Sequence, residues 1–327
     1  MVKRLKRPSI VSLSLLLSLT LFAAFTLPSV ASAEELYKAQ ESAKQEAIKT
    51  AANVENVTGI EEIQQSSETK SAFNSELTND TSAVEIPKNP EKPITVSDPL
   101  LGDQFVGINL PSNIVDSSAN GIKSDDGTIV YDNKDQNVGL AVQPTEDGVR
   151  NLINIKDKTA PKIYKFDIDV PEGSRLVKAV DYLGEEFDTG EVFIVDSNNI
   201  ITSVFTPAWA EDADGSSIPT HYEVEGNTLI QVVDFNENNV FPIVADPNWF
   251  KIAACAGAIA WFIGSTIFTA AKIIKVKKYI KALGGVANAA KLMLKATTWE
   301  EKLRVGGKAL MNLGLELSGI AALKVCF

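Results

Sequence analysis

The pattern of hydrophobic and polar positions changes several times along this chain of 327 residues. An apolar run over residues 10–25 is followed by polar residues with little periodicity. Short segments of alternating character fill the middle, and apolar residues at helical spacing recur from residue 248 onward. Alternation predicts strands, and a spacing of three to four predicts helices. We therefore expect an α+β multidomain protein, with an antiparallel β-sandwich-like domain followed by an all-α helical C-terminal domain.

The strand pattern is clearest over residues 163–170. Tyr164, Phe166 and Ile168 fall on one face of this segment, and the residues between them are mostly charged. Turn residues such as Asn198-Asn199 separate further runs of this kind. These runs are residues 105–110, 128–131, 138–142, 192–195, 200–205, 221–224, 229–233 and 241–244. Many short strands at such spacing predict a sandwich or barrel-like domain over residues 100–247.

The first 33 residues have the layout of a secretory signal peptide. Four basic residues precede the apolar run, and Ala31-Ser32-Ala33 supplies small residues for cleavage between Ala33 and Glu34. An uncleaved membrane anchor is the alternative. We therefore expect a secreted, extracellular protein, and association with a membrane or cell surface is compatible with this. In that environment a disulfide can persist.

Residues 34–99 form an acidic segment that we expect to be a largely flexible linker. Glu, Ser, Thr, Asn, Gln and Lys dominate it, and three prolines occur near its end. Residues 34–53 favour a helix because Ala, Glu, Lys and Gln predominate there. A short element of a helical bundle is the alternative interpretation.

Composition excludes several classes of function. The net charge of −11 argues against a nucleic-acid-binding protein, because contacts with phosphate need surplus Lys and Arg. One His and two Cys are too few for ordinary zinc or haem sites. A catalytic triad would have only His221 as its base. We expect no enzyme activity, no catalytic or metal-binding residues and no cofactor.

The charge is unevenly distributed along the chain. Residues 34–247 contain 39 acidic and 15 basic residues, whereas residues 248–327 contain 12 basic and three acidic residues. Such asymmetry within a chain is itself a signal. The C-terminal domain, residues 248–327, is therefore suited to anionic surfaces although the whole chain is not.

Several weak candidate sites lie in the β domain. Asp212-x-Asp214-Gly215 resembles the start of a calcium loop, but later acidic ligands at the required spacing are absent, which favours a turn. His221 lies in an alternating strand and is better interpreted as structural. The neighbouring carboxylates Glu185-Glu186 and Asp125-Asp126 carry no information about the spatial separation that a glycosidase requires.

Five short blocks carry a resemblance to known proteins. They are residues 206–209 (TPAW), 212–215 (DADG), 218–224 (IPTHYEV), 228–234 (TLIQVVD) and 241–247 (FPIVADP). Together they resemble mostly uncharacterised secreted proteins of Gram-positive bacteria. In that family a β domain ending in a Pro-x-Val-Ala-Asp-Pro-like motif precedes a helical, two-Cys, bacteriocin-like C-terminus. The resemblance covers about residues 160–327, and it implies architecture and export but no catalytic residue.

An uncharged stretch, residues 252–271, begins the C-terminal domain. Its length just meets the ~20 residues that a membrane-spanning helix needs. It is rich in Ala and contains no Leu, so a buried helix of a small bundle is an equally open interpretation.

The next stretch predicts an amphipathic helix. Its apolar residues recur on one helical face, and its lysines lie mainly on the opposite face. The combination fits attraction to anionic lipid headgroups. The candidate membrane-binding residues are Ile273, Val276, Ile280, Leu283, Lys275, Lys277, Lys278 and Lys281. Further helices are predicted over residues 286–296 and from Trp299, where Thr298 and Glu301 have capping-box spacing.

Both cysteines of the chain belong to the C-terminal domain. Cys255 lies near its start and Cys326 is the penultimate residue. In an exported protein this arrangement predicts a disulfide, with two buried free thiols as the alternative.

Two functions of different classes follow from these features. The first is a secreted precursor whose acidic β part carries a basic, disulfide-closed, membrane-active helical peptide of bacteriocin-like, antimicrobial type, freed by a protease near Asp246, Pro247 and Asn248. Its partner would be an anionic membrane surface or the cell envelope. The second is an intact secreted or cell-surface binding or structural protein, in which the helices are a stable domain or an anchor. A secreted hydrolase lacks a usable set of residues.

Overall fold

The computed structural model describes residues 30–64, 73–78, 83–97, 105–117, 119–145, 148–251, 254–265, 267–296 and 298–326. The chain divides into two compact units, residues 1–41 and residues 42–327. Because the described residues begin at residue 30, most of the expected signal peptide lies outside them. Helix α1 (Val30–Thr58) includes both Ala33 and Glu34. It also covers residues 34–53, where a helix was predicted.

In the second unit, a seven-stranded antiparallel sheet forms one layer of the β region. Its strands, in spatial order, are β1 (Phe73–Thr78), β2 (Ala83–Pro87), β3 (Ile94–Ser97), β4 (Phe105–Ile108), β9 (Ile163–Asp169), β15 (Thr228–Val233) and β14 (Thr220–Glu225). The alternation read from residues 163–170 appears as β9, in which Tyr164, Phe166 and Ile168 are buried and the intervening residues are exposed.

A ten-stranded antiparallel sheet forms the other layer. Its main path runs through β10 (Arg175–Lys178), β11 (Val192–Val195), β12 (Ile201–Phe205), β17 (Asn248–Lys251), β8 (Gly148–Ile155), β7 (Val138–Thr145), β6 (Ile129–Asn133) and β5 (Ile122–Lys123). Strands β13 (Ala210–Glu211) and β16 (Ile243–Ala245) pair with each other, and β16 also pairs with β8. A core of alternate residues from both sheets lies between them, as in a sandwich.

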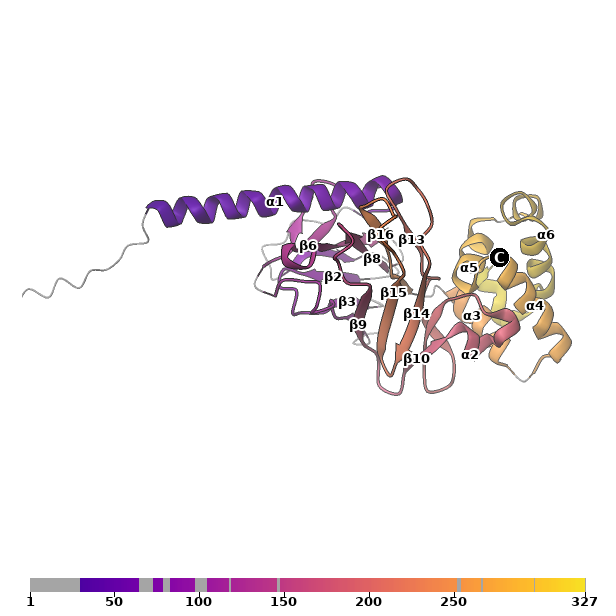
Figure 1. Ribbon diagram of the computed structural model, residues 1–327. Coiled ribbons are helices and arrows are strands. Elements are labelled where there is room, and N and C mark those ends of the chain that lie inside the picture. The colour runs from indigo at the N-terminus through magenta and orange to yellow at the C-terminus, as the bar shows by residue number, and fades with distance from the viewer. Residues whose placement is uncertain are drawn as a thin grey trace, which may run out of the picture. The chain divides into compact units, whose positions relative to one another are not determined.

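The helices of the C-terminal region follow the strands. They are α3 (Ala254–Gly264), α4 (Ala270–Ala282), α5 (Val286–Lys295) and α6 (Trp299–Leu317), with a final 3-10 turn, η3 (Ala321–Cys326). Figure 1 shows α3–α6 gathered together, with α2 (Ala179–Leu183) and β10 beside α3. The predicted order of a β domain followed by a helical domain is confirmed.

Helix α6 begins at the predicted capping box. Thr298 accepts a hydrogen bond from the backbone N–H of Glu301, and the Glu301 side chain accepts one from the backbone of Thr298. Gly307 has a φ of 59° and interrupts the helix, so its two halves change direction there. Trp299 consequently lies close to Gly314, where an added Cβ would be 2.8 Å from the indole ring.

The prediction of a flexible linker over residues 34–99 is wrong for much of that segment. Residues of β2 and β3, namely Val84, Ile86, Ile94 and Val96, are buried at alternate positions in the core of the sandwich. The prolines of this segment fall at or between strand ends, where a missing N–H costs no ladder hydrogen bond. The second half of α1 also packs on the sandwich, through Ala47, Ala51 and Val54.

The expected domain boundary after Pro247 does not coincide with a structural boundary. Residues 248–251 form β17, which lies in the sheet between β12 and β8. In addition, β10, β11, β12 and α2 contribute their outer faces to the core of the C-terminal helices. We call residues 175–205 the cover, and residues 254–326 the helical unit.

Candidate functional site: the covered helical unit

The apolar face of α4 is buried against the cover and the neighbouring helices. Val276 and Ile280 are 0% exposed and Leu283 is 7% exposed, while Ile273 is partly buried against the same core. The apolar residues predicted to bind a membrane are thus brought together on one face, as their spacing indicated. In the folded chain this face contacts protein.

The core beneath α4 is built jointly by the two parts of the chain. From the cover come Ala179, Leu183, Phe187, Phe193, Val195, Ile201 and Val204. From the helical unit come, among others, Ile259, Phe262, Val276, Ile280, Val286, Met293, Leu310 and Leu313. Burial of apolar surface stabilises by about 25 cal/mol per Å², so this shared core binds the cover to the helices.

Two of the candidate membrane-binding lysines are bound by the cover. The Nζ atom of Lys277 donates a hydrogen bond of 2.5 Å to the carbonyl of Leu183, and that of Lys281 donates one of 2.7 Å to the carbonyl of Glu186. The Lys277 ammonium also lies 5.6 Å from the centre of the Phe187 ring. Burial lowers the pKa of Lys277, because desolvation disfavours its charged form.

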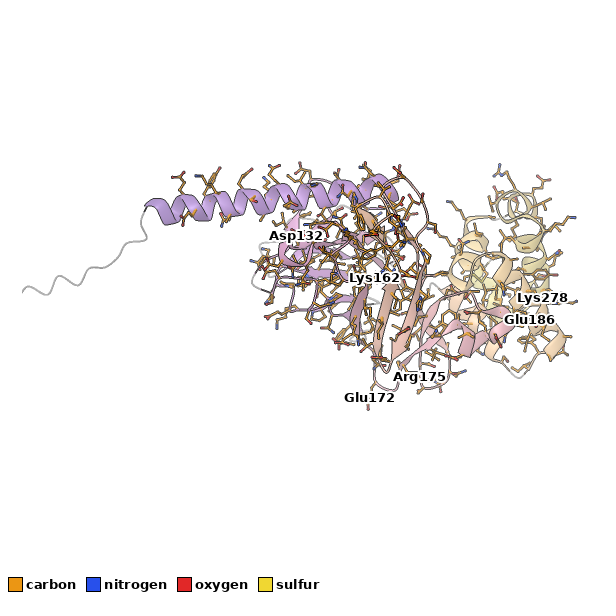
Figure 2. The ribbon with its side chains drawn as sticks, in the orientation of Figure 1. Asp132, Lys162, Glu172, Arg175, Glu186 and Lys278 are labelled. Carbon is orange, nitrogen blue, oxygen red and sulfur yellow. A yellow bond between two sulfur atoms is a disulfide. The ribbon has the colours of Figure 1, made fainter. Side chains whose placement is uncertain are left out.

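The other two candidate lysines have different surroundings. Lys275 forms an ion pair of 3.4 Å with Glu316 of α6, inside the helical unit. Lys278 is exposed, and Figure 2 labels it on the side of the molecule that carries α4. The four lysines therefore do not form one free cationic surface in the folded chain, although all four lie on α4.

Glu191 is a contact between cover and helical unit that the sequence analysis missed. Its carboxylate is 1% exposed and accepts hydrogen bonds from the backbone N–H groups of Val286 at 3.0 Å and Ala287 at 3.2 Å. N–H groups in the first turn of a helix have no acceptor within the helix, and negative charge is favourable at this end. Gly285 makes the approach possible, since a Cβ there would lie 2.5 Å from the carboxyl.

Burial raises the pKa of Glu191 to about 7, and its hydrogen bonds to Val286, Thr189 and Ala287 act in the opposite direction. The carboxyl of this residue can therefore titrate near neutral pH. No sequence motif marks it, because Glu191 and Val286, the residue that it binds at the start of α5, are 95 positions apart.

The two cysteines are joined in a disulfide, Cys255–Cys326, and both are fully buried. The bond ties η3 to α3 across 71 positions of sequence. It lies within the helical unit and does not connect this unit to the β-sandwich. The arrangement is the one expected from the position of the cysteines in the chain.

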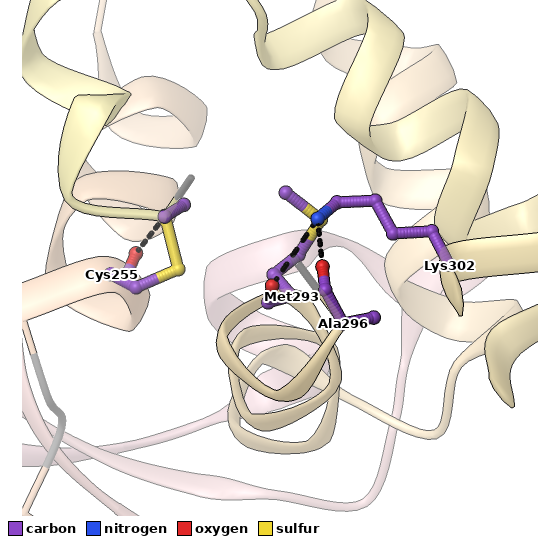
Figure 3. Close-up of a disulfide and its surroundings, with 5 residues drawn as sticks. Cys255, Met293, Ala296 and Lys302 are labelled. Carbon is purple, nitrogen blue, oxygen red and sulfur yellow. Dashed lines mark hydrogen bonds between the residues drawn. A yellow bond between two sulfur atoms is a disulfide. The ribbon is translucent and has the colours of Figure 1, made fainter. Parts of the chain in front are cut away.

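Lys302 is a second residue that the sequence analysis missed. It is 1% exposed, and its Nζ atom donates hydrogen bonds to the carbonyls of Met293 and Ala296 at the end of α5 (Figure 3). Burial lowers its pKa. Because lysines of amphipathic helices usually extend into solvent, its sequence position gave no signal of this role.

The uncharged stretch over residues 252–271 is divided between two helices. Its described part contains α3, which ends at Gly264, and the first residues of α4. Cys255, Ile259 and Phe262 are fully buried within the helical unit. Among the residues that the structure describes, no helix combines the length and the apolar character required to cross a bilayer.

The candidate processing segment lies within the sandwich. Asp246 is fully buried, and its two carboxylate oxygens accept hydrogen bonds of 3.1 Å from the backbone N–H groups of Trp209 and Asn248. Burial raises the pKa of Asp246 well above its usual range, against the opposing effect of these hydrogen bonds. Because β16 and β17 both pair with β8, β17 would have to separate from the sheet before a protease could bind the peptide bond between Asp246 and Pro247.

Two of the weaker candidate residues of the β domain, Asp212 and His221, lie in a turn and on a strand. Asp212 is buried and accepts hydrogen bonds from the backbone N–H groups of Asp214 and Ser216, which closes a turn. His221 is exposed on β14, with Glu223 at 3.5 Å. Within the described ranges, no group of three or more His, Cys, Asp or Glu side chains has an arrangement that could hold a metal ion.

An open groove of about 1030 Å³ lies on the outer face of the seven-stranded sheet. Most of its lining residues are polar, among them Asn109, Lys165, Asp167, Asp169 and Thr228, and the rest are apolar. Many of these groups bind one another: Asn109 donates to the Asp169 carboxylate at 3.1 Å, and Thr228 donates to that of Asp167 at 2.6 Å. The groove is suited to a polar ligand on a sheet surface.

Comparisons of this chain with protein-family models, with curated proteins and with solved structures find no match.

Proposed function

We propose that this protein is a secreted precursor in which the β part stores a membrane-active helical unit in a covered form. The observation that supports this is the contact between α4 and the cover. The apolar residues Val276, Ile280 and Leu283 pack into a core that the cover shares, and Lys277 and Lys281 are bound by its carbonyls. The apolar face of α4 and two of its four candidate lysines thus contact the cover.

Loss of the cover would expose the properties that it hides. The helices would lose the contacts with Leu183, Phe187, Phe193 and the other apolar residues of the cover. A large apolar surface would then adjoin uncapped ammonium groups in a region with 12 basic and three acidic residues. An apolar surface edged by lysines is attracted to anionic lipids and inserts into their headgroup region.

Dye release from vesicles tests the proposal. Oxidised peptide 248–327 should release dye from vesicles rich in phosphatidylglycerol at low salt, and the intact chain should not. Replacing Lys277 and Lys281 by Gln in the peptide should weaken release, whereas replacing Lys308 and Lys324, which are exposed on other elements, should weaken it less. A peptide that neither binds nor permeabilises these vesicles would contradict the proposal.

A second candidate function is supported by a different observation. Strand β17 lies between β12 and β8, and the core of the helices continues into the cover, as in a protein that acts as one piece. In that case the groove on the seven-stranded sheet would bind a polar ligand of the cell envelope. Mass spectrometry of culture medium separates the two functions, because the precursor produces a fragment that begins near Pro247 or Asn248 and the intact protein does not.

A further inference from the structure

The bond between Asp246 and Pro247 is fixed at both ends by the same neighbouring strand. β16 ends one residue before this bond and β17 begins one residue after it, and both pair with β8. The carbonyl of Pro247 accepts a hydrogen bond of 3.2 Å from the backbone N–H of Asn151 in β8. The peptide unit is therefore held in one position in the folded chain.

The Asp246 side chain is hydrogen-bonded to the residue that follows this peptide unit. Its Oδ2 atom accepts a hydrogen bond of 3.1 Å from the backbone N–H of Asn248, two residues further on, so the hydrogen-bonded ring of atoms includes the bond to Pro247. Its Oδ1 atom accepts a hydrogen bond from the backbone N–H of Trp209, which fixes the rotation of the group. Asp246 is 0% exposed.

We propose that Asp246–Pro247 is a self-cleaving junction, in which the Asp246 carboxyl group attacks its own backbone carbonyl carbon. A new C–O bond closes a five-membered cyclic anhydride, and the C–N bond to Pro247 breaks. The proton of the carboxylic acid moves to the proline nitrogen, which leaves as a secondary amine. Water then opens the anhydride and leaves two carboxyl groups on Asp246, so no oxidant or reductant is needed.

General chemistry favours this residue pair. A carboxyl group is an established nucleophile in proteins, and a neutral carboxylic acid supplies the proton for the leaving group as well. Proline forms a tertiary amide, whose nitrogen accepts a proton more readily than that of an ordinary peptide. Two hydrogen bonds fix the rotation of the carboxyl group beside its own carbonyl, and this removes part of the entropic barrier.

Burial supports the reactive protonation state. It raises the pKa of Asp246, and each unit of that rise increases the protonated fraction about tenfold at a given higher pH. Among the described residues, the charged or titratable side chains near Asp246 include Arg150 of β8 and Tyr222 of β14. Arg150 is paired with Glu62, and the Tyr222 hydroxyl is buried without a hydrogen-bond partner among the described residues.

The cut gives the proposed precursor a release step that needs no protease at the buried bond. The purpose of the step rests on the proposed function, but its chemistry does not. Both cysteines lie after the cut, so no disulfide would join the two pieces. Strand β17 and the shared core would still hold them together until the sheet opens.

The test is incubation of the purified full chain, free of protease, between about pH 4 and about pH 8. Denaturing mass spectrometry should find a fragment that begins at Pro247. The first-order rate constant for its formation should be independent of protein concentration and should rise as the pH falls. The chain contains one other aspartyl–prolyl bond, Asp98–Pro99, which lies outside the described residues and serves as a reference. At about pH 5, cleavage after Asp246 in the native chain should be about tenfold faster than cleavage after Asp98. It should also be about tenfold faster than cleavage after Asp246 in the chain unfolded by urea.

Two variants complete the test. Asp246→Asn removes the acid and should abolish the fragment, and Pro247→Ala keeps the acid but replaces the leaving nitrogen, so cleavage should slow. If Asp246→Asn fails to fold, the inference is still tested by Pro247→Ala and by the comparison of the native chain with the chain in urea. Equal rates at both bonds, or no faster cleavage in the native chain than in urea, would overturn the inference. Dye release by peptide 248–327 without self-cleavage would leave the proposed function intact, and self-cleavage without dye release would overturn that function alone.

Discussion

The carboxylate of Glu191 accepts a hydrogen bond of 3.0 Å from the backbone N–H of Val286, the first residue of α5. Glu191 belongs to the cover and Val286 to the helical unit. The contact therefore joins the two parts of the chain at a buried point. It places an ionisable group where its protonation affects how firmly the helices are held.

The pH dependence of folding tests this contact. The pKa of Glu191 is raised from 4.5 to about 7 by burial, so between these values the folded chain holds a proton that the unfolded chain has released. Stability should therefore fall as the pH rises through this window, by about 3 kcal/mol for this group alone. Glu191→Gln should flatten the fall, measured by urea unfolding at several pH values.

The matched control is Glu185→Gln, since Glu185 is exposed in the short 3-10 turn of the cover, η2 (Glu185–Phe187). This variant should keep the slope of the parent chain. A Glu191→Gln chain with an unchanged slope would show that the buried carboxyl does not titrate as described.

Phe187 should determine how firmly the cover is attached to α4. It is 7% exposed, packs in the shared core and lies under the Lys277 ammonium. Phe187→Ala should cost about 3 kcal/mol or more, because it leaves a cavity in the core. Amide hydrogen exchange in α4 should become faster than in the sandwich strands. Phe105→Ala is the control, since Phe105 is 48% exposed, and it should cost less than about 0.5 kcal/mol.

Gly285 should tolerate no side chain. It has a φ of 116°, and a Cβ would lie 2.5 Å from the Glu191 carboxyl, so Gly285→Ala suffers both backbone strain and a steric clash. Gly226→Ala separates the two effects. Gly226 also has a positive φ, 62°, but no atom within 4 Å of an added Cβ, and its replacement should cost only about 1 kcal/mol. Equal thermal shifts for the two variants would contradict the clash with Glu191.

The disulfide should stabilise the helical unit more than the sandwich. Closing a loop of 71 positions removes unfolded-chain entropy worth about 4 kcal/mol. The double variant Cys255→Ala, Cys326→Ala should therefore lower the melting temperature of the helices. Hydrogen exchange in α3 and η3 should become faster, while exchange in β7 and β8 stays the same. The reduced parent chain is the control and should behave in the same way.

The sequence determined those features that depend on local periodicity. Alternation over residues 163–170 predicted β9, the spacing of Ile273, Val276 and Ile280 predicted α4, and Thr298 with Glu301 predicted the start of α6. The order of a β domain and a helical domain follows from the same patterns. Each of these signals lies within a few residues of sequence, so one chain is sufficient to detect it.

Only the tertiary structure decided which surfaces meet. It placed β1, β2 and β3 in a sheet, inserted β17 between β12 and β8, and covered α4 with Leu183 and Phe187. It also brought Glu191 to α5 and buried Lys302 beneath Met293 and Ala296. An amphipathic pattern states that a face must be covered but does not identify the partner, because burial of apolar surface is not directional. The partner is set by contacts between residues far apart in the chain, which no local pattern records.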